Sequence, residues 1–304
     1  MKIYIATPMY GGIAKSFFVA SLQNLVQVLN SRGHTVVHSS TTNESLITRA
    51  RNTLAHQFMK SDYDALLFID ADHGFNAEDV ALMVDSGKDL IGAIYPMKTI
   101  NWDNVRNAAL LGLPNLSDYS GAFAINYLPE AQSFNGNEPF KVRDIGTGMM
   151  FVRRNVFEAL KTVVPVYKNN SPMPDIAMGE DIYEYFTTVI DPDGQILLSE
   201  DYAFCKFWRD LGNDVYAAPW VAITHSGDYN YDGRFLKSLE LAQAVQQAQA
   251  QAEAVANLDS QAEQTPEDSS QLSDTTSADS VSESPADSDG QQSSDKKTQK
   301  SAKK

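Results

Sequence analysis

An apolar run that ends in two closely spaced carboxylates constrains the fold more than any other segment. Residues 64–69 read Asp-Ala-Leu-Leu-Phe-Ile, and Asp70, Ala71 and Asp72 follow at once. Such a run is typical of a strand that is buried on both faces of a parallel sheet. Where this kind of strand ends, its side chains leave the interior and face the ligand crevice of an open α/β fold. The segment therefore predicts a ligand-binding sheet edge at Asp70 and Asp72.

These two carboxylates are suited to a divalent cation. Mg²⁺ and Mn²⁺ prefer oxygen ligands, and they often share their coordination among carboxylates, substrate phosphates and water. We therefore expect Asp70 and Asp72 to hold Mg²⁺ or Mn²⁺ beside a nucleotide diphosphate. The alternative is that a strand-end aspartate only caps the helix that follows it.

The apolar pattern of the first 217 residues alternates between strand and helix. The expected strands are 2–6, 34–38, 64–69, 89–94, 149–153 and 215–217, and the expected helices are 15–31, 44–60, 77–86, 154–161 and 200–211. Thr41 and Glu44 have the spacing of a capping box at the start of the second helix. Strands that alternate with helices predict a largely parallel α/β sheet.

The composition changes near the C-terminus. From about residue 246 the chain is rich in Gln, Ala, Ser, Asp and Glu and has almost no large apolar residue, so it cannot offset the entropy of ordering. We expect a folded domain over 1–233, an Ala/Gln-rich helix over 234–256, and a disordered acidic tail with a Lys-rich end over 257–304.

Charge and cysteine content exclude several classes of protein. Of the formal charge of −15, the segment 245–304 carries −6, which leaves −9 on the expected domain. This acidic balance disfavours a protein that grips nucleic acid along its backbone. The single cysteine, Cys205, excludes an internal disulfide framework, and no apolar stretch approaches the ~20 residues that span a bilayer. We expect a soluble protein in the cytoplasm.

The loop after the first expected strand is a candidate nucleotide contact. Residues 7–12 read Thr-Pro-Met-Tyr-Gly-Gly. Glycines let the backbone approach a ligand closely, and Tyr10 offers a face on which a base can stack. Thr7, Pro8 and Tyr10 are therefore predicted to bind the nucleotide. A tight turn without a ligand is the alternative.

Basic residues in two places are candidate phosphate contacts. Arg49 and Arg51 lie two apart on an expected helix, so they point to different faces. We expect Arg51 to point inward and clamp a diphosphate with its planar fork, and Arg49 to form a surface ion pair. Lys98, just after the fourth expected strand, is a second candidate for the phosphate or the sugar, although a lone lysine is more often an ordinary surface residue.

Three residues late in the chain complete the candidate site. Glu200 and Asp201 begin an expected helix after Ser199, where carboxylates are also favoured by the helix dipole alone. Near a metal and a sugar, such a carboxylate would serve as a base towards an acceptor hydroxyl. His225 follows an apolar strand, and a neutral imidazole there would complete the coordination of the cation.

In this order, the segments resemble glycosyltransferases of the GT-A fold, in particular those of family 2. The resemblance covers about residues 1–230 and rests on the Arg-Asn helix at 49–52, the Asp-Ala-Asp motif at 70–72, Gly146-Thr147-Gly148, the Glu-Asp pair at 200–201 and His225. It implies an open mixed sheet of the GT-A type with a Rossmann-like nucleotide-binding half.

The resemblance also implies roles for these residues. Asp70 would contact the ribose or sugar and share the metal with Asp72, and His225 would be a further metal ligand. Asp201, with Glu200, would supply the base. Gly146, Thr147 and Gly148 would form a loop beside the acceptor. The implied donor is a nucleotide-sugar, with a UDP- or GDP-sugar favoured.

One departure from the family pattern and one further similarity bear on what the resemblance implies. The Gln-x-x-Arg-Trp motif of processive family 2 synthases is absent, and residues 205–209 only echo it, so a polymer-extruding synthase is not expected. The Arg-Asn helix, the Asp-Ala-Asp motif and the late histidine are also similar to retaining mannosyltransferases of the fungal Golgi type. Inversion and retention of the anomeric configuration both stay open.

The predicted function is metal-dependent transfer of one sugar to an acceptor hydroxyl. The alternatives are a nucleotidyltransferase, for which the loop after the first strand has few basic residues, and a non-catalytic binding protein of the same fold. A glycan, a protein or a small molecule is favoured as acceptor over a modified nucleic acid. Aromatic residues in the irregular regions 99–145 and 165–180 are candidates for an acceptor surface, namely Trp102, Tyr119, Phe134 and Tyr167.

Overall fold

The central sheet is open and mixed. In this computed structural model, which describes residues 1–130, 134–173 and 175–262, seven strands form the sheet in the order β2-β1-β3-β11-β5-β16-β9. β11 and β9 run antiparallel to their neighbours, and the other five strands run parallel to one another. In the same order the strands span Thr35–Thr42, Lys2–Met9, Ala65–Ile69, Met149–Arg153, Leu90–Ala93, Val215–Ala218 and Phe140–Val142.

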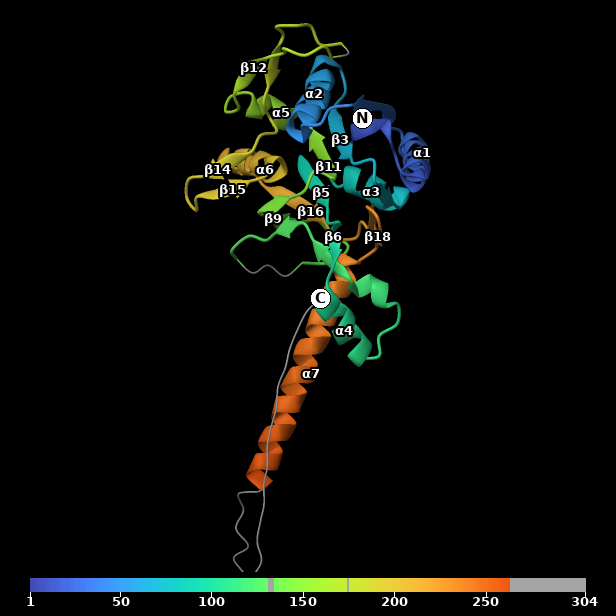
Figure 1. Cartoon of the computed structure of the whole chain (residues 1–304), viewed down its shortest axis with the longest axis vertical. Coiled ribbons are helices and arrows are strands. Elements are labelled where there is room, and N and C mark those ends of the chain that lie inside the picture. Colours follow the sequence, from blue (N-terminus) through green and yellow to red (C-terminus); the bar gives the residue numbers. More distant parts are fainter. Residues whose placement is uncertain (131–133, 174, 263–304) are drawn as a thin grey trace, which may run out of the picture. The chain divides into compact units, whose positions relative to one another are not determined.

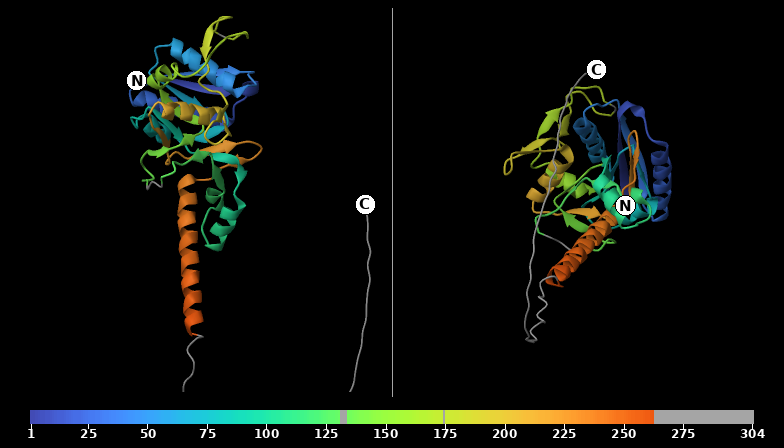
Figure 2. Two further views of the ribbon diagram at one scale, coloured as in Figure 1. Left: turned by 90° about the vertical axis from the view of Figure 1, so that its left-hand side faces the viewer. Right: turned by 60° about the horizontal axis from the view of Figure 1, so that its bottom comes forward.

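Helices cover both faces of this sheet (Figures 1 and 2). Helices α1 and α3 pack on one face, and α2, α5 and α6 pack on the other. Helix α4 lies outside these two layers, and the first residues of α7 pack against the core on the side of α2, α5 and α6. The helices span Ser16–Ser31 (α1), Ile47–Lys60 (α2), Ala77–Val84 (α3), Trp102–Leu110 (α4), Arg154–Leu160 (α5), Glu200–Asp210 (α6) and Phe235–Ala262 (α7).

Alternation along the strands divides the apolar side chains between two cores. In β3, Leu66 and Phe68 pack with α2, α5 and α6, whereas Leu67 and Ile69 pack with α1 and α3. Successive side chains of a strand point to opposite faces, so a strand covered on both sides must be apolar throughout. All five residues of β3 are buried. This burial explains the unbroken apolar run that precedes Asp70.

Short strands outside the central sheet complete the described part of the chain. A three-stranded sheet has the order β18-β17-β4, and the remaining pairs are β10-β8, β12-β13, β14-β15 and β6-β7. These strands span His73–Phe75 (β4), Pro96–Ile100 (β6), Gly121–Phe123 (β7), Ile125–Asn126 (β8), Asp144–Ile145 (β10), Val166–Lys168 (β12), Asp181–Tyr183 (β13), Val189–Asp191 (β14), Ile196–Leu198 (β15), Ile223–Ser226 (β17) and Asn230–Tyr231 (β18). Two single turns of 3₁₀-helix span Tyr10–Gly12 and Leu116–Tyr119.

The expected fold class is confirmed, with differences of detail. The Rossmann-like half consists of the parallel strands β2, β1 and β3 with their helices. The chain leaves the central sheet after β5 and returns as β9 and β11, and β11 lies antiparallel between β3 and β5. The expected capping box at Thr41 is wrong, because Thr41 lies in β2 and α2 begins later, after Leu46. The Glu44 carboxylate instead accepts a hydrogen bond from the Leu46 amide.

The chain divides into two units, Met1–Glu253 and Ala254–Lys304. The helix expected over 234–256 spans Phe235–Ala262, so the described residues of the second unit continue α7. The tail expected over 257–304 otherwise lies outside the described residues. In the described ranges, none of the helices combines the length and apolarity that a bilayer crossing demands.

Candidate functional site

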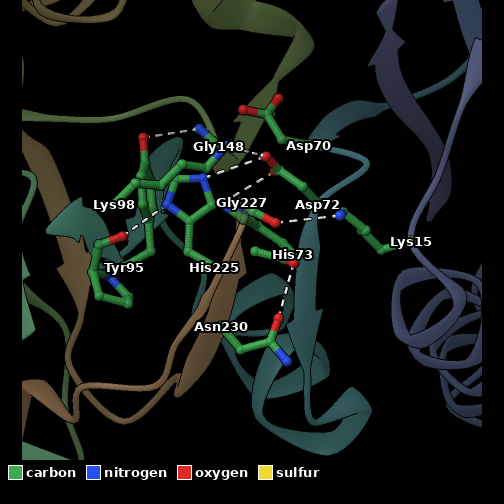
Figure 3. A network of polar contacts seen from close by, with 12 residues as sticks. Lys15, Asp70, Asp72, His73, Tyr95, Lys98, Gly148, His225, Gly227 and Asn230 are labelled. Atoms are coloured by element: carbon green, nitrogen blue, oxygen red, sulfur yellow. Dashed lines mark hydrogen bonds and ion pairs between the residues drawn. The ribbon is translucent and has the colours of Figure 1, made fainter. Parts of the chain in front are cut away.

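Two histidines and one aspartate converge beyond the end of β3. Strand β4 pairs antiparallel with β17, and the register places His73 directly opposite His225. The Ser226 amide donates a hydrogen bond to the carbonyl of Asp72, which extends this pairing back to the Asp-Ala-Asp segment. One ligand atom each from Asp72, His73 and His225 lies within 4.8 Å of the others. This trio is the candidate metal site (Figure 3).

The His225 ring is held in the orientation that a metal ligand needs. Its Nδ1 lies 2.8 Å from the carbonyl oxygen of Pro96, which can only accept, so Nδ1 carries the proton. In the neutral ring, Nε2 then presents a lone pair, and it lies 3.5 Å from Oδ2 of Asp72. A backbone carbonyl that fixes the outer nitrogen is the usual support of a metal-bound histidine.

His73 is completely buried, yet neither of its ring nitrogens has a hydrogen-bond partner in the described part of the chain. Its Nε2 lies 4.0 Å from Oδ1 of Asp72, and its ring centroid lies 4.6 Å from that of His225. Burial lowers the pKa of His73 to about 4, so the ring is neutral near pH 7. An unsatisfied, neutral imidazole beside a carboxylate can ligate a divalent transition-metal cation.

Asp72 is the hub of the trio and also pairs with a lysine. Lys98 Nζ lies 2.7 Å from Oδ2 of Asp72. Partial burial raises the pKa of the Asp72 carboxyl, but the contacts with His225 and Lys98 outweigh it and hold that pKa well below its usual range. Asp72 is therefore a permanent anion near pH 7.

Glycines let the backbone pass close behind these ligands. Gly146, Thr147 and Gly148 are all buried, and a Cβ on Gly146 would lie 2.0 Å from the Tyr95 hydroxyl. A Cβ on Gly148 would lie 2.5 Å from Cε1 of His73. The Gly148 amide donates to the Tyr95 hydroxyl at 3.3 Å. The structure thus places the expected acceptor loop against Tyr95 and His73, next to the candidate metal ligands.

A pocket of about 310 Å³ lies next to the trio. It joins the end of β1 to the Asp-Ala-Asp segment and is lined by Pro8, Met9, Tyr10, Ile13, Lys15, Glu44, Ser45, Ile47, Asp70, Ala71 and Asp72. Tyr10 is 74% exposed, so its ring is free to stack on a ligand. Thr7 is buried instead, and its hydroxyl contacts Nε2 of His38 at 3.0 Å. The pocket has the size of a small-ligand site.

Arg51 points inward, as expected, and links the two acidic motifs. It is 4% exposed, and its guanidinium lies 3.3 Å from the carboxylate of Asp70 and 3.5 Å from that of Glu200. Asp70 is therefore engaged with Arg51 and is not one of the grouped ligand residues. Arg49 forms the expected surface ion pair, with Glu44. A guanidinium buried between two carboxylates has little surface left for a diphosphate.

The first turn of α6 holds the candidate base. The Ser199 hydroxyl and the Tyr202 amide both donate to Oδ1 of Asp201, so Ser199 orients this carboxylate rather than capping the helix with its side chain. Burial and the neighbouring Asp201 raise the pKa of Glu200, although Arg51 opposes the rise. Glu200 is thus linked to Asp70 through the Arg51 guanidinium, and Asp201 is the next residue in the chain.

The aromatic residues expected at an acceptor surface do not gather in one place. Trp102 is 69% exposed, but Tyr119 is buried against Ala108 and Leu241. The ring of Phe134 stacks on Phe140 with centroids 3.9 Å apart. Tyr119 and Phe134 are therefore packing residues, which corrects that expectation.

Three residues of this site escaped the sequence analysis: His73, Tyr95 and Lys15. His73 directly follows Asp72, and this adjacency could have marked it as a candidate ligand. However, strand β4, which turns His73 towards His225, has only three residues and shows no periodicity. Tyr95 lies two residues beyond the end of β5, and no motif marks it. Lys15 lines the pocket, and its Nζ lies 3.4 Å from the carbonyl oxygen of Gly227.

Comparisons with known protein families and with curated proteins find no match. Solved structures similar to this chain include A197 from STIV, with 15% identity over 75% of this chain and 87% of that chain, at a TM-score of 0.41. They also include GalNAc-T7 with UDP, GalNAc and Mn²⁺ (11% identity, 78% of this chain and 47% of that chain, TM-score 0.38). A third is S. aureus TarS 1–349 in complex with UDP-GlcNAc (15% identity, 71% of this chain and 56% of that chain, TM-score 0.34). The chain spans about half of the last two proteins, and likeness at this level carries no argument about function.

Proposed function

We propose that the chain is a metal-dependent glycosyltransferase that moves one sugar from a nucleotide-sugar to an acceptor hydroxyl. The observation that carries the proposal is the trio of Asp72, His73 and His225 at the edge of the pocket that follows β1. A carboxylate and two imidazoles beside a pocket that includes Pro8 and Tyr10 suit a cation held against a nucleotide diphosphate.

The three residues of the trio would supply two kinds of metal ligand. Asp72 supplies the anionic ligand, and His73 and His225 supply neutral nitrogen ligands. When bound, Mn²⁺ or Mg²⁺ would neutralise the charge that develops on the departing diphosphate. Asp70 lines the pocket and is held by Arg51, which supports the expected contact of Asp70 with the ribose or the sugar.

The acidic pair on α6 is proposed to handle the acceptor. Both hydrogen bonds to Asp201 engage Oδ1, which leaves Oδ2 to accept the proton of an acceptor hydroxyl if the reaction inverts. Glu200 and Arg51 are positioning residues in this scheme, because their contacts tie the start of α6 to Asp70. If the reaction retains configuration, Asp201 orients the acceptor instead.

The donor is proposed to lie along the pocket with its base near Pro8 and Tyr10 and its diphosphate near Asp72. A UDP- or GDP-sugar is the favoured donor, and a glycan, a protein or a small molecule is the favoured acceptor. Gly146, Thr147 and Gly148 are proposed to position Tyr95 and His73 behind the site rather than to contact the acceptor.

Donor hydrolysis tests the proposal. Purified protein is incubated with UDP-, GDP-, TDP- and CMP-sugars, with Mn²⁺ or Mg²⁺, and the products are separated. Release of free sugar and of the nucleotide from one donor supports a glycosyltransferase. Release of pyrophosphate from a nucleoside triphosphate and a sugar phosphate would instead indicate a nucleotidyltransferase. Metal-dependent nucleotide binding without turnover of any donor or triphosphate would indicate a binding protein.

A further inference from the structure

Lys98 occupies the side of Asp72 that a cation would use. Its Nζ lies 2.7 Å from Oδ2 of Asp72, and Nε2 of His225 lies 3.5 Å from the same oxygen (Figure 3). The ammonium group therefore neutralises the one anionic member of the trio. An ammonium and a divalent cation compete for one carboxylate oxygen, since each needs its charge.

His225 directs its second ring nitrogen at the same oxygen of Asp72. Its Nδ1 donates to the Pro96 carbonyl, and its Nε2 lies 3.5 Å from Oδ2 of Asp72. Lys98 comes from β6, the strand that also carries Pro96, so one segment places both the ammonium and the carbonyl that orients His225.

Lys98 is free to leave this position. Its side chain is 44% exposed, and its stem passes over Gly227, where an added Cβ would lie 3.3 Å from Cδ of Lys98. A flexible four-carbon stem with its head at the surface swings at little cost. Lys15 provides a contrast, because its ammonium contacts the Gly227 carbonyl and no ligand of the trio.

We propose that Lys98 is a built-in counter-cation, which holds Asp72 until the metal binds and is then displaced to contact the diphosphate. This inference rests on the proposed function and adds that metal affinity is lowered by the chain's own lysine. The released ammonium lies beside the site that the diphosphate would take, so metal binding prepares the site for the donor. Lys98 is a positioning residue before the metal binds and a binding residue afterwards.

Titration of Mn²⁺ into the protein without any nucleotide tests the first half of the proposal. Lys98→Met keeps the length of the stem and removes its charge. We expect it to bind Mn²⁺ about tenfold more tightly than the wild type, since the competing charge is gone. Lys141→Met is the matched control, because Lys141 also pairs with one aspartate, Asp214, at 2.7 Å, and contacts no member of the trio. We expect its affinity for Mn²⁺ to change by less than about threefold, because only screened, indirect repulsion is removed.

Titration with manganese pyrophosphate tests the second half. Lys98→Met should bind this complex about threefold more weakly than the wild type, because it lacks the released ammonium. Lys98→Met is thus expected to bind Mn²⁺ more tightly and manganese pyrophosphate more weakly than the wild type. General damage to the site would weaken the binding of both. Lys98→Gln should repeat both changes, and thermal unfolding without metal verifies that each variant is folded.

The outcomes separate the inference from the proposed function. If wild type and Lys98→Met bind Mn²⁺ equally and Asp72→Ala does not bind it, the counter-cation role is overturned and the metal site stands. If Lys98→Met binds more weakly than the wild type, the inference is also overturned. If no variant binds Mn²⁺, the metal site itself fails, and the inference fails with it.

Discussion

His73 and His225 lie directly opposite each other in the antiparallel pair of β4 and β17, with their ring centroids 4.6 Å apart. Side chains at such paired positions point to the same face, so the register of these short strands builds the candidate metal site. A slip of one residue would turn one histidine to the other face. The Ser226 amide, bonded to the Asp72 carbonyl, fixes the register from the side of the aspartate.

Removal of either histidine should therefore weaken the metal site. We expect His73→Ala and His225→Ala each to lower the affinity for Mn²⁺ by at least about tenfold, since each removes a nitrogen ligand. Electron paramagnetic resonance of free Mn²⁺ measures this loss. His56→Ala is the control, because His56 contacts Glu180 and is not one of the three candidate ligands. Equal affinity in His73→Ala and the wild type would remove His73 from the site.

Arg51 should matter for stability because it is buried between two carboxylates. Arg51→Met leaves Asp70 and Glu200 without their shared counter-charge, and we expect the free energy of unfolding to fall by about 3 kcal/mol. Urea unfolding measures this change. Arg49→Met, which breaks only the surface pair with Glu44, should cost less than about 1 kcal/mol. Similar losses in both variants would contradict a structural role for the buried bridge.

Gly148 should not tolerate a side chain. In Gly148→Ala, the new methyl group would meet Cε1 of His73 at 2.5 Å, so His73 or the backbone must move. We expect a loss of about 2 kcal/mol in the free energy of unfolding together with weaker Mn²⁺ binding. Gly194→Ala is the control, since its Cβ would meet only the flexible end of Ile196 at 3.2 Å. Unchanged Mn²⁺ binding in a folded Gly148→Ala protein would argue against tight packing behind His73.

Acid should remove a contribution of Glu180 to stability. Hydrogen bonds from Lys60, the Ala177 amide and His56 lower the pKa of Glu180 from 4.5 to about 2. Because the folded state favours the ionised form, this contribution is complete above about pH 4.5 and is lost as the pH falls towards 2. The stability difference between wild type and Glu180→Gln should therefore shrink over this range in urea unfolding. A difference that stays constant would contradict the assignment.

The central sheet was readable from the sequence because its strands are buried on both faces. The unbroken apolar run of β3 indicates burial on both faces without knowledge of the partner strands. The antiparallel entry of β11 was not readable from local pattern, since a strand that is apolar throughout looks alike in either direction.

The candidate site was only partly readable. Asp72 was found because it follows a strand. His225 was expected to follow an apolar strand, but it lies within β17, and the structure brings it next to Asp72. His73 was missed because β4 has three residues, too few to show a period of two. Whether Asp70 would face a metal or an arginine depends on the position of Arg51 in space, which the spacing along the chain does not give.

The central claim is metal-dependent transfer at Asp72. The most direct test measures nucleotide release from the donor that the panel identifies, with Mn²⁺ or with EDTA, for the wild type and for Asp72→Ala. We predict release by the wild type with Mn²⁺ and a loss of about a hundredfold or more with EDTA or in Asp72→Ala. Release that is unchanged by EDTA and by Asp72→Ala would contradict the account.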